Sequence, residues 1–383
     1  MLGAMPTDPV AHLRGRRSVK WTAYPPDVLP LWVAELDLPP APAVTAVLRD
    51  AVERGDTGYV NPRTVRAVEA YADFARDAWG WEVDPARTAL TTDVSVVIVE
   101  GLRRLTRPGD GVILTPPVYP PFYDLIPEAG ARVVEVPLLE EAATPALDLA
   151  GIDAALAAGA RGVLLCHPHN PLGLVHPREQ LAELARIVER RGGFVLSDEI
   201  HAPLTHHGVA FTPYLDVSDA ARRHGLTAAS GSKAFNLAGL KCAFFVAAGE
   251  EMTALVRGLP DEVSYRTGLF GALATRAGFE DGRDWLATTI TAIEANVALL
   301  HHLLATHLPD VTVNHPRASY LAWLDLRALG WGDDPAAVAL DRARVALSSG
   351  PTFGPQGAGF ARMNLGCSPE TLVEAVRRLA AAR

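Results

Sequence analysis

Three polar residues of different chemistry follow three short apolar runs of the chain. Asn170 follows Gly162–Cys166, Asp198 follows Phe194–Ser197, and Lys233 follows Thr227–Ala229. Such runs are typical of strands that are buried on both faces of a parallel sheet. Because ligands of open α/β sheets bind beyond the carboxyl ends of the strands, we expect the three side chains to converge on one sheet edge.

An amine, a carboxylate and an amide in one place suit pyridoxal phosphate (PLP). This cofactor needs a lysine amine that forms an imine with its aldehyde, and Lys233 is the candidate. It needs a carboxylate that keeps its pyridine nitrogen protonated, for which Asp198 is suited. Asn170 offers a neutral donor to the phenolate oxygen. The set predicts a PLP enzyme that acts on an amino acid.

A longer series of motifs extends this set over nearly the whole chain. The motifs are Lys20-Trp21, Leu31–Ala34, Pro117–Phe122, Asn170–Gly173, Asp198–His201 and Ser230–Leu240. Their order and spacing resemble the fold-type I aminotransferase superfamily (classes I and II), and more narrowly the MalY/PatB-type cystathionine β-lyases. The resemblance implies PLP as cofactor, a small amino-acid substrate and a homodimer with shared active sites.

The resemblance also implies a role for further residues. Tyr119 would stack on the PLP ring and join Lys233 and Asp198 in catalysis, while Ile200 would press on the other ring face. The phosphate would be bound by Ser230, Lys241, Val94 and Ser95, and by Tyr59 of the neighbouring subunit. The substrate would be bound by Arg362, Ala34 and Asn170, and a guanidinium suits the α-carboxylate because it donates two parallel hydrogen bonds.

Two segments depart from the pattern of the family. The phosphate loop, which usually carries a glycine, reads Thr92-Asp93-Val94-Ser95. A carboxylate does not favour a phosphate at a helix N-terminus, so we expect Asp93 to point away and cap the helix. The second segment reads Ala34-Glu35-Leu36-Asp37-Leu38, where relatives typically have Ala-Asp-Met-Asp-Phe. That segment lines the substrate pocket in the family.

The preferred reaction is α,β-elimination of L-cystathionine or a related S-substituted cysteine, which yields pyruvate, ammonia and a thiol. Lys233 would take the Cα proton as general base. The alternative is an aminotransferase that passes the amino group to a 2-keto acid. A regulatory protein without activity is a further alternative, and Asp93 is the one feature in its favour. A Ser-Lys hydrolase would leave Asn170, Asp198 and Arg362 unexplained.

Alternating helix-like and strand-like segments surround these residues. We expect helices at Ala43–Arg54, Arg63–Trp79, Val94–Leu105, Leu149–Ala157, Arg178–Arg190, Trp285–Leu308 and Pro369–Ala382. Further strands are expected at Gly111–Thr115, Arg132–Val136, Cys242–Ala247, Ser319–Asp325 and Ala361–Asn364. The pattern predicts an α/β large domain, residues 43–282, with a mainly parallel sheet. Residues 1–42 and 283–383 would form a smaller α/β domain, with Tyr24–Pro42 packed between the two.

Composition limits the remaining possibilities. The 383 residues carry a net charge of −9 and no long basic cluster, which argues against a nucleic-acid partner. No apolar stretch approaches the length of a membrane span, and Met1–Met5 lacks the apolar run of a signal peptide. Three widely spaced cysteines fit a reducing compartment, so we expect a cytoplasmic protein. His167, His169, His201, His206 and His207 match no metal motif, and we interpret them as polar pocket or loop residues. For His201, which lies next to the site, we expect a place in the core or behind the residues that contact the ligands.

Overall fold

The computed structural model describes residues 10–140 and 144–383. The N-terminal Met1–Met5, on which the signal-peptide argument rests, lies outside these residues. Short 3-10 segments connect many of the elements: η1 (Pro85–Arg87), η2 (Ala202–Leu204), η3 (Tyr214–Asp216), η4 (Ala238–Leu240), η5 (Arg327–Leu329), η7 (Gly350–Phe353) and η8 (Pro355–Gly357), with one π-helical turn, η6 (Ala339–Ala343).

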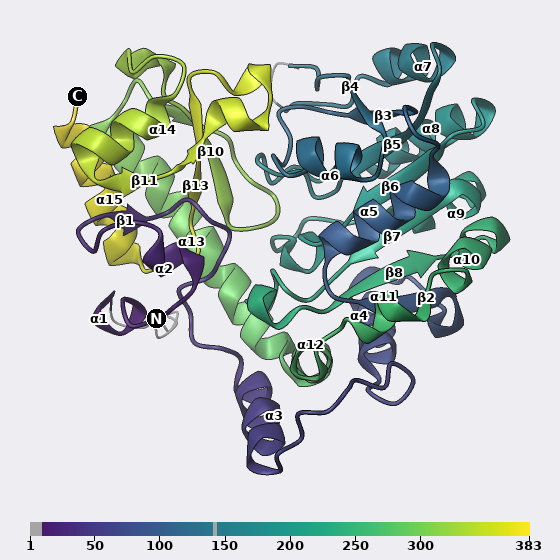
Figure 1. Cartoon of the computed structure of the whole chain (residues 1–383). Helices are drawn as coiled ribbons and strands as arrows, with labels where there is room; N and C mark the ends of the chain where they lie inside the picture. The colour runs from purple at the N-terminus through teal and green to yellow at the C-terminus, as the bar shows by residue number, and fades with distance from the viewer. Residues whose placement is uncertain (1–9, 141–143) are drawn as a thin grey trace.

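A seven-stranded sheet forms the centre of the larger part of the molecule (Figure 1). Its strands are β2 (Thr88–Thr91), β3 (Gly111–Leu114), β4 (Arg132–Glu135), β5 (Ala160–Cys166), β6 (Phe194–Asp198), β7 (Gly225–Ala229) and β8 (Ala243–Ala247). The spatial order is β2-β8-β7-β6-β5-β3-β4, and only β8 runs antiparallel to its neighbours. The expected mainly parallel sheet is therefore confirmed.

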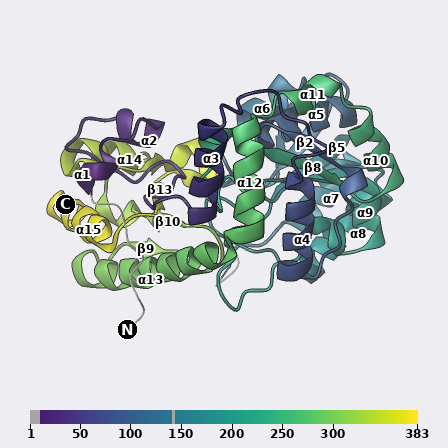
Figure 2. The same cartoon turned by 90° about the horizontal axis from the view of Figure 1, so that it is seen from below.

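Helices cover both faces of this sheet, as apolar strands require. They are α3 (Pro42–Glu53), α4 (Ala67–Trp79), α5 (Val94–Leu105), α6 (Phe122–Glu128), α7 (Leu149–Ala157), α8 (Arg178–Arg190), α9 (Asp219–His224), α10 (Glu250–Arg257), α11 (Asp261–Tyr265) and α12 (Leu269–Asp281). One hydrophobic cluster joins α5, α6, α10 and α11 to one face, and a second joins α4, α7, α8 and α12 to the other. Figure 2 shows α3 beside α12.

Helix α5 lies unusually close to the sheet. A side chain at Gly101, in the middle of this helix, would bring its Cβ to 3.0 Å from Leu196 and 3.1 Å from Leu226. Glycine at this position therefore lets the helix approach the strands, which fixes where the first turn of α5 lies above the sheet edge.

The rest of the chain forms a smaller unit around a four-stranded antiparallel sheet, β12-β13-β10-β9. Its elements are α1 (Val10–Leu13), α2 (Val19–Thr22), β1 (Leu29–Pro30), α13 (Arg283–His307), β9 (Thr312–Val313), β10 (Leu321–Asp325), α14 (Pro335–Val338), β11 (Val345–Ala346), β12 (Ser348–Ser349), β13 (Phe360–Asn364) and α15 (Pro369–Ala381). A separate hydrophobic cluster joins Leu29 and Leu31 to residues 297–379.

This cluster supports the division into residues 43–282 and residues 1–42 with 283–383, which we propose as the domain organisation. Helix α13 belongs to both parts, because Leu286 and Ile290 pack in a cluster of the large part and Val297 and Leu300 in that of the small part. The expected packing of the N-terminal segment between the two parts is observed: the Leu36 backbone bonds Asn236 of the large part, and the Asp37 amide bonds the Gly366 carbonyl.

One helix begins later than its sequence suggests. The segment at 63–66 was expected to be helical, but α4 begins at Ala67. Asn61 accepts hydrogen bonds from the amides of Arg63 and Thr64 and so forms a turn. Arg66 then adopts a left-handed conformation with φ of 58°. These local bonds compete with the helix and delay its start.

Candidate active site

A cavity of about 190 Å³ opens at the carboxyl edge of the large sheet. Lys233, Asp198 and Asn170 all line it, although they lie at or beyond the carboxyl ends of three different strands, β7, β6 and β5. Arg362 joins them from β13 of the small sheet. The structure therefore brings together the amine, the carboxylate, the amide and the guanidinium that the sequence predicted for one site.

Asp198 is the last residue of β6 and is 4% exposed. Its Oδ1 accepts a hydrogen bond of 3.0 Å from the Ile200 amide. Burial raises the pKa of Asp198 to about 7, although that hydrogen bond and the nearby Lys233 oppose the shift. The carboxylate forms no ion pair within residues 10–140 and 144–383, so a cation in the cavity would stabilise it. A protonated pyridine nitrogen is a cation of this kind.

Lys233 lies in the loop after β7 and faces the cavity rather than bulk solvent. Its Nζ donates a hydrogen bond of 3.0 Å to the carbonyl of Ala34. Burial and the positive charge of Arg362 lower the pKa of Lys233 to about 8. A neutral amine is therefore accessible close to neutral pH, as both imine formation and proton abstraction require.

Asn170 and Arg362 form a pair across the two parts of the molecule. The Arg362 Nη1 donates to the Asn170 Oδ1 at 2.9 Å, which leaves the amide nitrogen of Asn170 as a donor. Arg362 Nη2 donates to the carbonyl of Trp32 at 2.9 Å and to the hydroxyl of Ser348 at 3.0 Å. The buried Nε of Arg362 has no partner in the described part of the chain. This free donor suits a carboxylate ligand.

The first turn of α5 lies at the same cavity, with Val94 and Ser95 among its lining residues. The structure confirms the expected cap, because Asp93 is the N-cap and its Oδ1 accepts from the Val96 amide at 3.2 Å. The expectation that Asp93 points away from the site is wrong, since Asp93 itself lines the cavity. Its other oxygen, Oδ2, forms an ion pair of 3.4 Å with Lys241. The carboxylate is thus held by the helix and by a cation, and both Lys241 and the helix N-terminus remain beside the cavity as an anion site.

Tyr119 and Ile200 line the cavity, as the resemblance implied. His201 also lines the cavity, so our expectation that it lies in the core or behind the ligand-contacting residues is wrong. Its Nδ1 lies 3.0 Å from the hydroxyl of Ser319. Burial, followed by the charges of Lys233 and Arg362, lowers the pKa of His201 to about 3, so its imidazole is neutral.

Two predicted phosphate ligands do not line the cavity. The Ser230 hydroxyl is buried, donates to the Cys242 carbonyl at 2.7 Å and accepts from the Ser232 amide at 3.0 Å. Ser232 lines the cavity in its place. Tyr59 is 93% exposed, so within one subunit it contacts no ligand in this cavity. The phosphate roles of Ser230 and Tyr59 stay predictions.

Other residues near the site escaped the sequence analysis. Tyr320 is fully buried, and its hydroxyl donates to the Ala34 carbonyl at 3.0 Å, the same oxygen that receives Lys233. Thr92, Cys166 and Cys242 line the cavity. The sequence offered a signal for three of these residues: Thr92 lies in the predicted phosphate loop, and Cys166 and Cys242 lie at the ends of predicted strands. Burial raises the pKa of both thiols, which makes them poor nucleophiles.

A larger cavity of about 750 Å³ lies elsewhere and contains none of the predicted site residues. Residues that line it include His206, Glu294, Asn314 and Arg317. It has no lysine, and its chemistry does not match the predicted set. Within residues 10–140 and 144–383 no group of histidine, cysteine or acidic side chains is arranged to hold a metal, and no helix there is long and apolar enough to span a membrane.

Comparison with known proteins agrees with this geometry. The model of the aminotransferase class I and II family matches residues 26–379. A provisionally named cystathionine beta-lyase of Mycobacterium leprae is 42% identical, over 97% of this chain and 96% of its own. Cystathionine beta-lyase PatB of Bacillus subtilis is 34% identical, over 96% of this chain and 97% of its own. A crystal structure of a provisionally named PLP-dependent beta-cystathionase of Corynebacterium diphtheriae superposes with a TM-score of 0.94 at 33% identity, and covers 99% of both chains.

Proposed function

Because the chain belongs to the class I and II aminotransferase family, in its MalY/PatB-type carbon-sulfur lyase branch, we propose that it is a PLP-dependent cystathionine β-lyase. Its fold is PLP fold-type I. The proposed reaction converts L-cystathionine or a related S-substituted cysteine into pyruvate, ammonia and a thiol. The observation that carries the proposal is the single cavity that holds Lys233, Asp198, Asn170 and Arg362 in a chain similar to such lyases over nearly its full length.

The residues of the cavity fit the cofactor in chemical type. Asp198 is a buried carboxylate without an ion pair in the described residues, and it would hold a proton on the ring nitrogen. Lys233 would carry the cofactor, and the Asn170 amide would donate to the phenolate oxygen. Tyr119 and Ile200 would pack on the two ring faces. Lys241, Ser232 and the first turn of α5 would bind the phosphate.

When bound, PLP supplies an aldehyde for the substrate amine and a ring that withdraws electrons from the bonds at Cα. Arg362 binds the substrate α-carboxylate and thereby orients the Cα–H bond. Lys233, once its amine is free, takes the Cα proton; its lowered pKa of about 8 keeps part of it neutral. The sulfur then leaves Cβ as a thiol, and water converts the remaining three-carbon fragment to pyruvate and ammonia.

The general PLP residues do not distinguish elimination from transamination, because both reactions use Lys233, Asp198 and Arg362. The choice of elimination is supported by relatives named as cystathionine beta-lyases at 33–42% identity. The test is incubation of the holoenzyme with L-cystathionine and no keto acid. Sustained release of pyruvate and thiol is expected, and Lys233→Ala should lose this turnover together with the visible absorbance of the bound cofactor.

An aminotransferase would behave differently in the same assay. Turnover would stop after about one equivalent of substrate per site, because the cofactor ends in its amine form, and it would resume when a 2-keto acid is added. That result would reverse our choice of reaction. Retention of the visible band and of turnover by Lys233→Ala would instead contradict the assignment of the lysine.

We further propose a cytoplasmic homodimer in which each subunit contributes to the site of the other. Tyr59 supports this arrangement, because it is almost fully exposed in one subunit and lies in the loop before α4, where the family places a contact with the phosphate of the partner. Cys166, Cys242 and Cys367 are free and buried, which fits a reducing compartment.

A further inference from the structure

The residues that lead from β1 toward α3 form an irregular segment at the active site. We call residues 32–38 the strap. Two of its residues, Val33 and Ala34, line the cavity. The strap belongs to no helix or strand, so its carbonyls need hydrogen-bond partners from elsewhere.

Side chains supply those partners to five successive carbonyls. Trp32 O accepts from Arg362 and Ser348, Val33 O from Asn364, Ala34 O from Lys233 and Tyr320, Glu35 O from Lys20 and Asn364, and Leu36 O from Arg16 and Asn236. Two of the donors, Lys233 and Arg362, belong to the proposed catalytic machinery. The position of the strap is therefore linked directly to the positions of the reacting amine and of the guanidinium.

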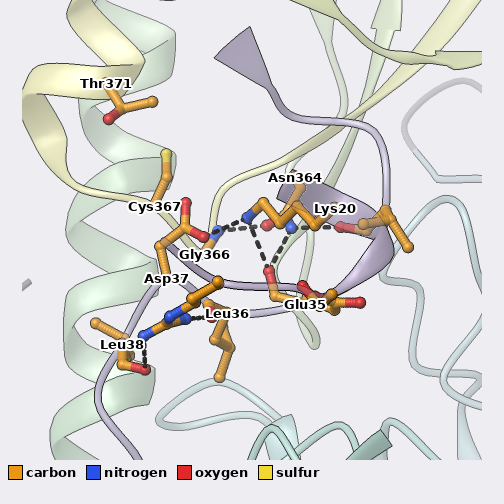
Figure 3. A network of polar contacts seen from close by, with 12 residues as sticks. Lys20, Glu35, Leu36, Asp37, Leu38, Asn364, Gly366, Cys367 and Thr371 are labelled. Carbon is orange, nitrogen blue, oxygen red and sulfur yellow. Dashed lines mark hydrogen bonds and ion pairs between the residues drawn. The ribbon is translucent and has the colours of Figure 1, made fainter. Parts of the chain in front are cut away.

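A buried ion pair lies at the far end of the strap from the cavity (Figure 3). The Nζ of Lys20 lies 2.7 Å from Oδ1 of Asp37, and each residue is 1% exposed. The same Nζ donates to the Glu35 carbonyl at 3.1 Å. The amide of Asp37 donates to the Gly366 carbonyl at 2.7 Å and so ties the strap to the small part of the molecule. One ammonium group thus contacts two strap residues on either side of Leu36.

Stability alone does not explain this pair. Burial raises the pKa of Asp37 even though Lys20 opposes the shift, which reflects the cost of moving the carboxylate out of water. Apolar side chains of similar volume usually stabilise such a position at least as well as an ion pair does. The ion pair and the Glu35 hydrogen bond are directional contacts, so they fix how residues 35 and 37 lie relative to α2. Ala34 immediately precedes these residues, so its carbonyl is fixed with them.

We propose that Lys20 and Asp37 are positioning residues that hold the strap so that the Ala34 carbonyl receives the amine of Lys233. This inference rests on the proposed function, in which Lys233 is the base at Cα. A fixed acceptor confines the freed amine to one place beside the substrate. The proposal also gives a role to Lys20 of the Lys20-Trp21 motif, which has none in the proposed catalytic mechanism.

The test replaces both charges with apolar side chains of similar size, in the double variant Lys20→Met with Asp37→Leu. The holoenzyme is compared with the wild type in three measurements: thermal midpoint, amide hydrogen exchange of the strap, and kcat and KM for L-cystathionine. We expect an unchanged thermal midpoint and strap amides that exchange about tenfold faster or more. We expect kcat to fall about tenfold or more, because the base loses its fixed position. KM should change less than kcat does, because Arg362 loses at most the Trp32 carbonyl and keeps Asn170 and Ser348 as partners.

A matched control removes an exposed ion pair that joins the N-terminal segment to the C-terminal part of the chain. Arg344 and Asp27 lie 2.7 Å apart at the surface, outside the strap. The double variant Asp27→Leu with Arg344→Met should leave strap exchange and kcat unchanged. If the first double variant does not fold, Lys20→Gln with Asp37→Asn, which removes both charges but keeps a donor and an acceptor, should show the same changes at smaller size.

Two results would overturn the proposal. One is wild-type strap exchange and wild-type kcat in a folded variant without the ion pair. The other is a loss of kcat without faster exchange, which would mean that the pair acts by another route. If the wild type itself releases no pyruvate, the proposed function fails, whereas the exchange measurement still decides whether the ion pair holds the strap.

Discussion

At the scale of single residues, burial shifts the proposed acid and base of the site in opposite directions. It raises the pKa of Asp198 to about 7 and lowers that of Lys233 to about 8. Both shifts disfavour the charged form in a poorly hydrated cavity. The two groups are thus poised for different tasks: the carboxylate is stabilised by any cation that enters, and the amine is available to accept a proton.

Asp198→Asn tests the first of these tasks. The amide has nearly the same shape but no charge, so it does not keep a proton on the ring nitrogen of PLP. We expect cofactor binding to persist while kcat for pyruvate release falls by roughly a hundredfold or more, in line with loss of a preorganised charge. Steady-state kinetics and cofactor content are the measurements. Near-normal turnover with full cofactor content would remove Asp198 from the mechanism.

At the scale of elements, the N-terminus of α5 combines features that favour an anion with one that does not. The helix end and Lys241 attract a phosphate, whereas Asp93 carries a negative charge. The structure resolves this conflict by giving Asp93 two partners, the Val96 amide and the ammonium of Lys241. The cost is that Lys241 shares its charge between the carboxylate and any bound anion.

Asp93→Asn should therefore strengthen cofactor binding. Asparagine is as good an N-cap as aspartate, so the helix keeps its first turn. Both side chains of the ion pair are partly exposed, at 33% for Asp93 and 56% for Lys241, so solvent screens the effect. We expect the Kd for PLP to fall about threefold. Lys241→Met is the opposite control and should raise the Kd, and an unchanged or higher Kd for Asp93→Asn would show that its charge does not oppose the phosphate.

At the scale of the whole molecule, stability depends on histidines that are buried in neutral form. His167 and His169 are fully buried in the loop that follows β5, and burial lowers the pKa of each to about 4. In the unfolded chain these imidazoles bind protons below about pH 6.5. Between pH 6.5 and 4 the unfolded state therefore binds more protons, and their contribution to stability is lost as pH falls.

Two buried acids affect the pH dependence of stability in the opposite direction. Burial raises the pKa of Asp198 to about 7 and that of Glu199 to about 8, so their contribution to stability increases as pH falls. A comparison with His167→Gln isolates the histidine, since the amide still offers a donor to the Thr212 carbonyl. Between pH 7 and 5 the wild type should lose about 2 kcal/mol more unfolding free energy than the variant. Urea unfolding at both pH values measures this difference, and equal losses would show that folding does not lower the pKa of His167.

The proposed dimer gives a second prediction at this scale. If Tyr59 reaches the phosphate of the partner, Tyr59→Phe should weaken PLP binding, because one hydrogen bond to a charged group contributes about 2 kcal/mol. The dimer itself should remain intact. Light scattering and cofactor titration are the measurements. An active monomer would contradict the shared site, and unchanged affinity in Tyr59→Phe would remove this tyrosine from it.

The amino-acid sequence determined the type of fold and the kind of chemistry. Buried strands read as continuous apolar runs, so β5, β6 and β7 were predicted within a few residues of their observed bounds. Asn170, Asp198 and Lys233 lie at or just after the carboxyl ends of these strands, and the parallel arrangement of the strands brings them to one edge. The helix cap at Asp93 was also predictable, because capping depends on a few neighbouring residues.

Only the tertiary structure decided which further groups contact the cavity or the strap, and which do not. Tyr320 and Lys20 act on the strap from positions about 286 and 15 residues away in sequence, and no local pattern predicts such contacts. The same holds for Ser230, whose hydroxyl is taken by the Cys242 carbonyl, and for His201, which faces the cavity through its bond with Ser319. Local sequence fixes where strands and caps form, whereas hydrogen-bond partners between distant segments depend on how the two parts of the molecule pack against each other.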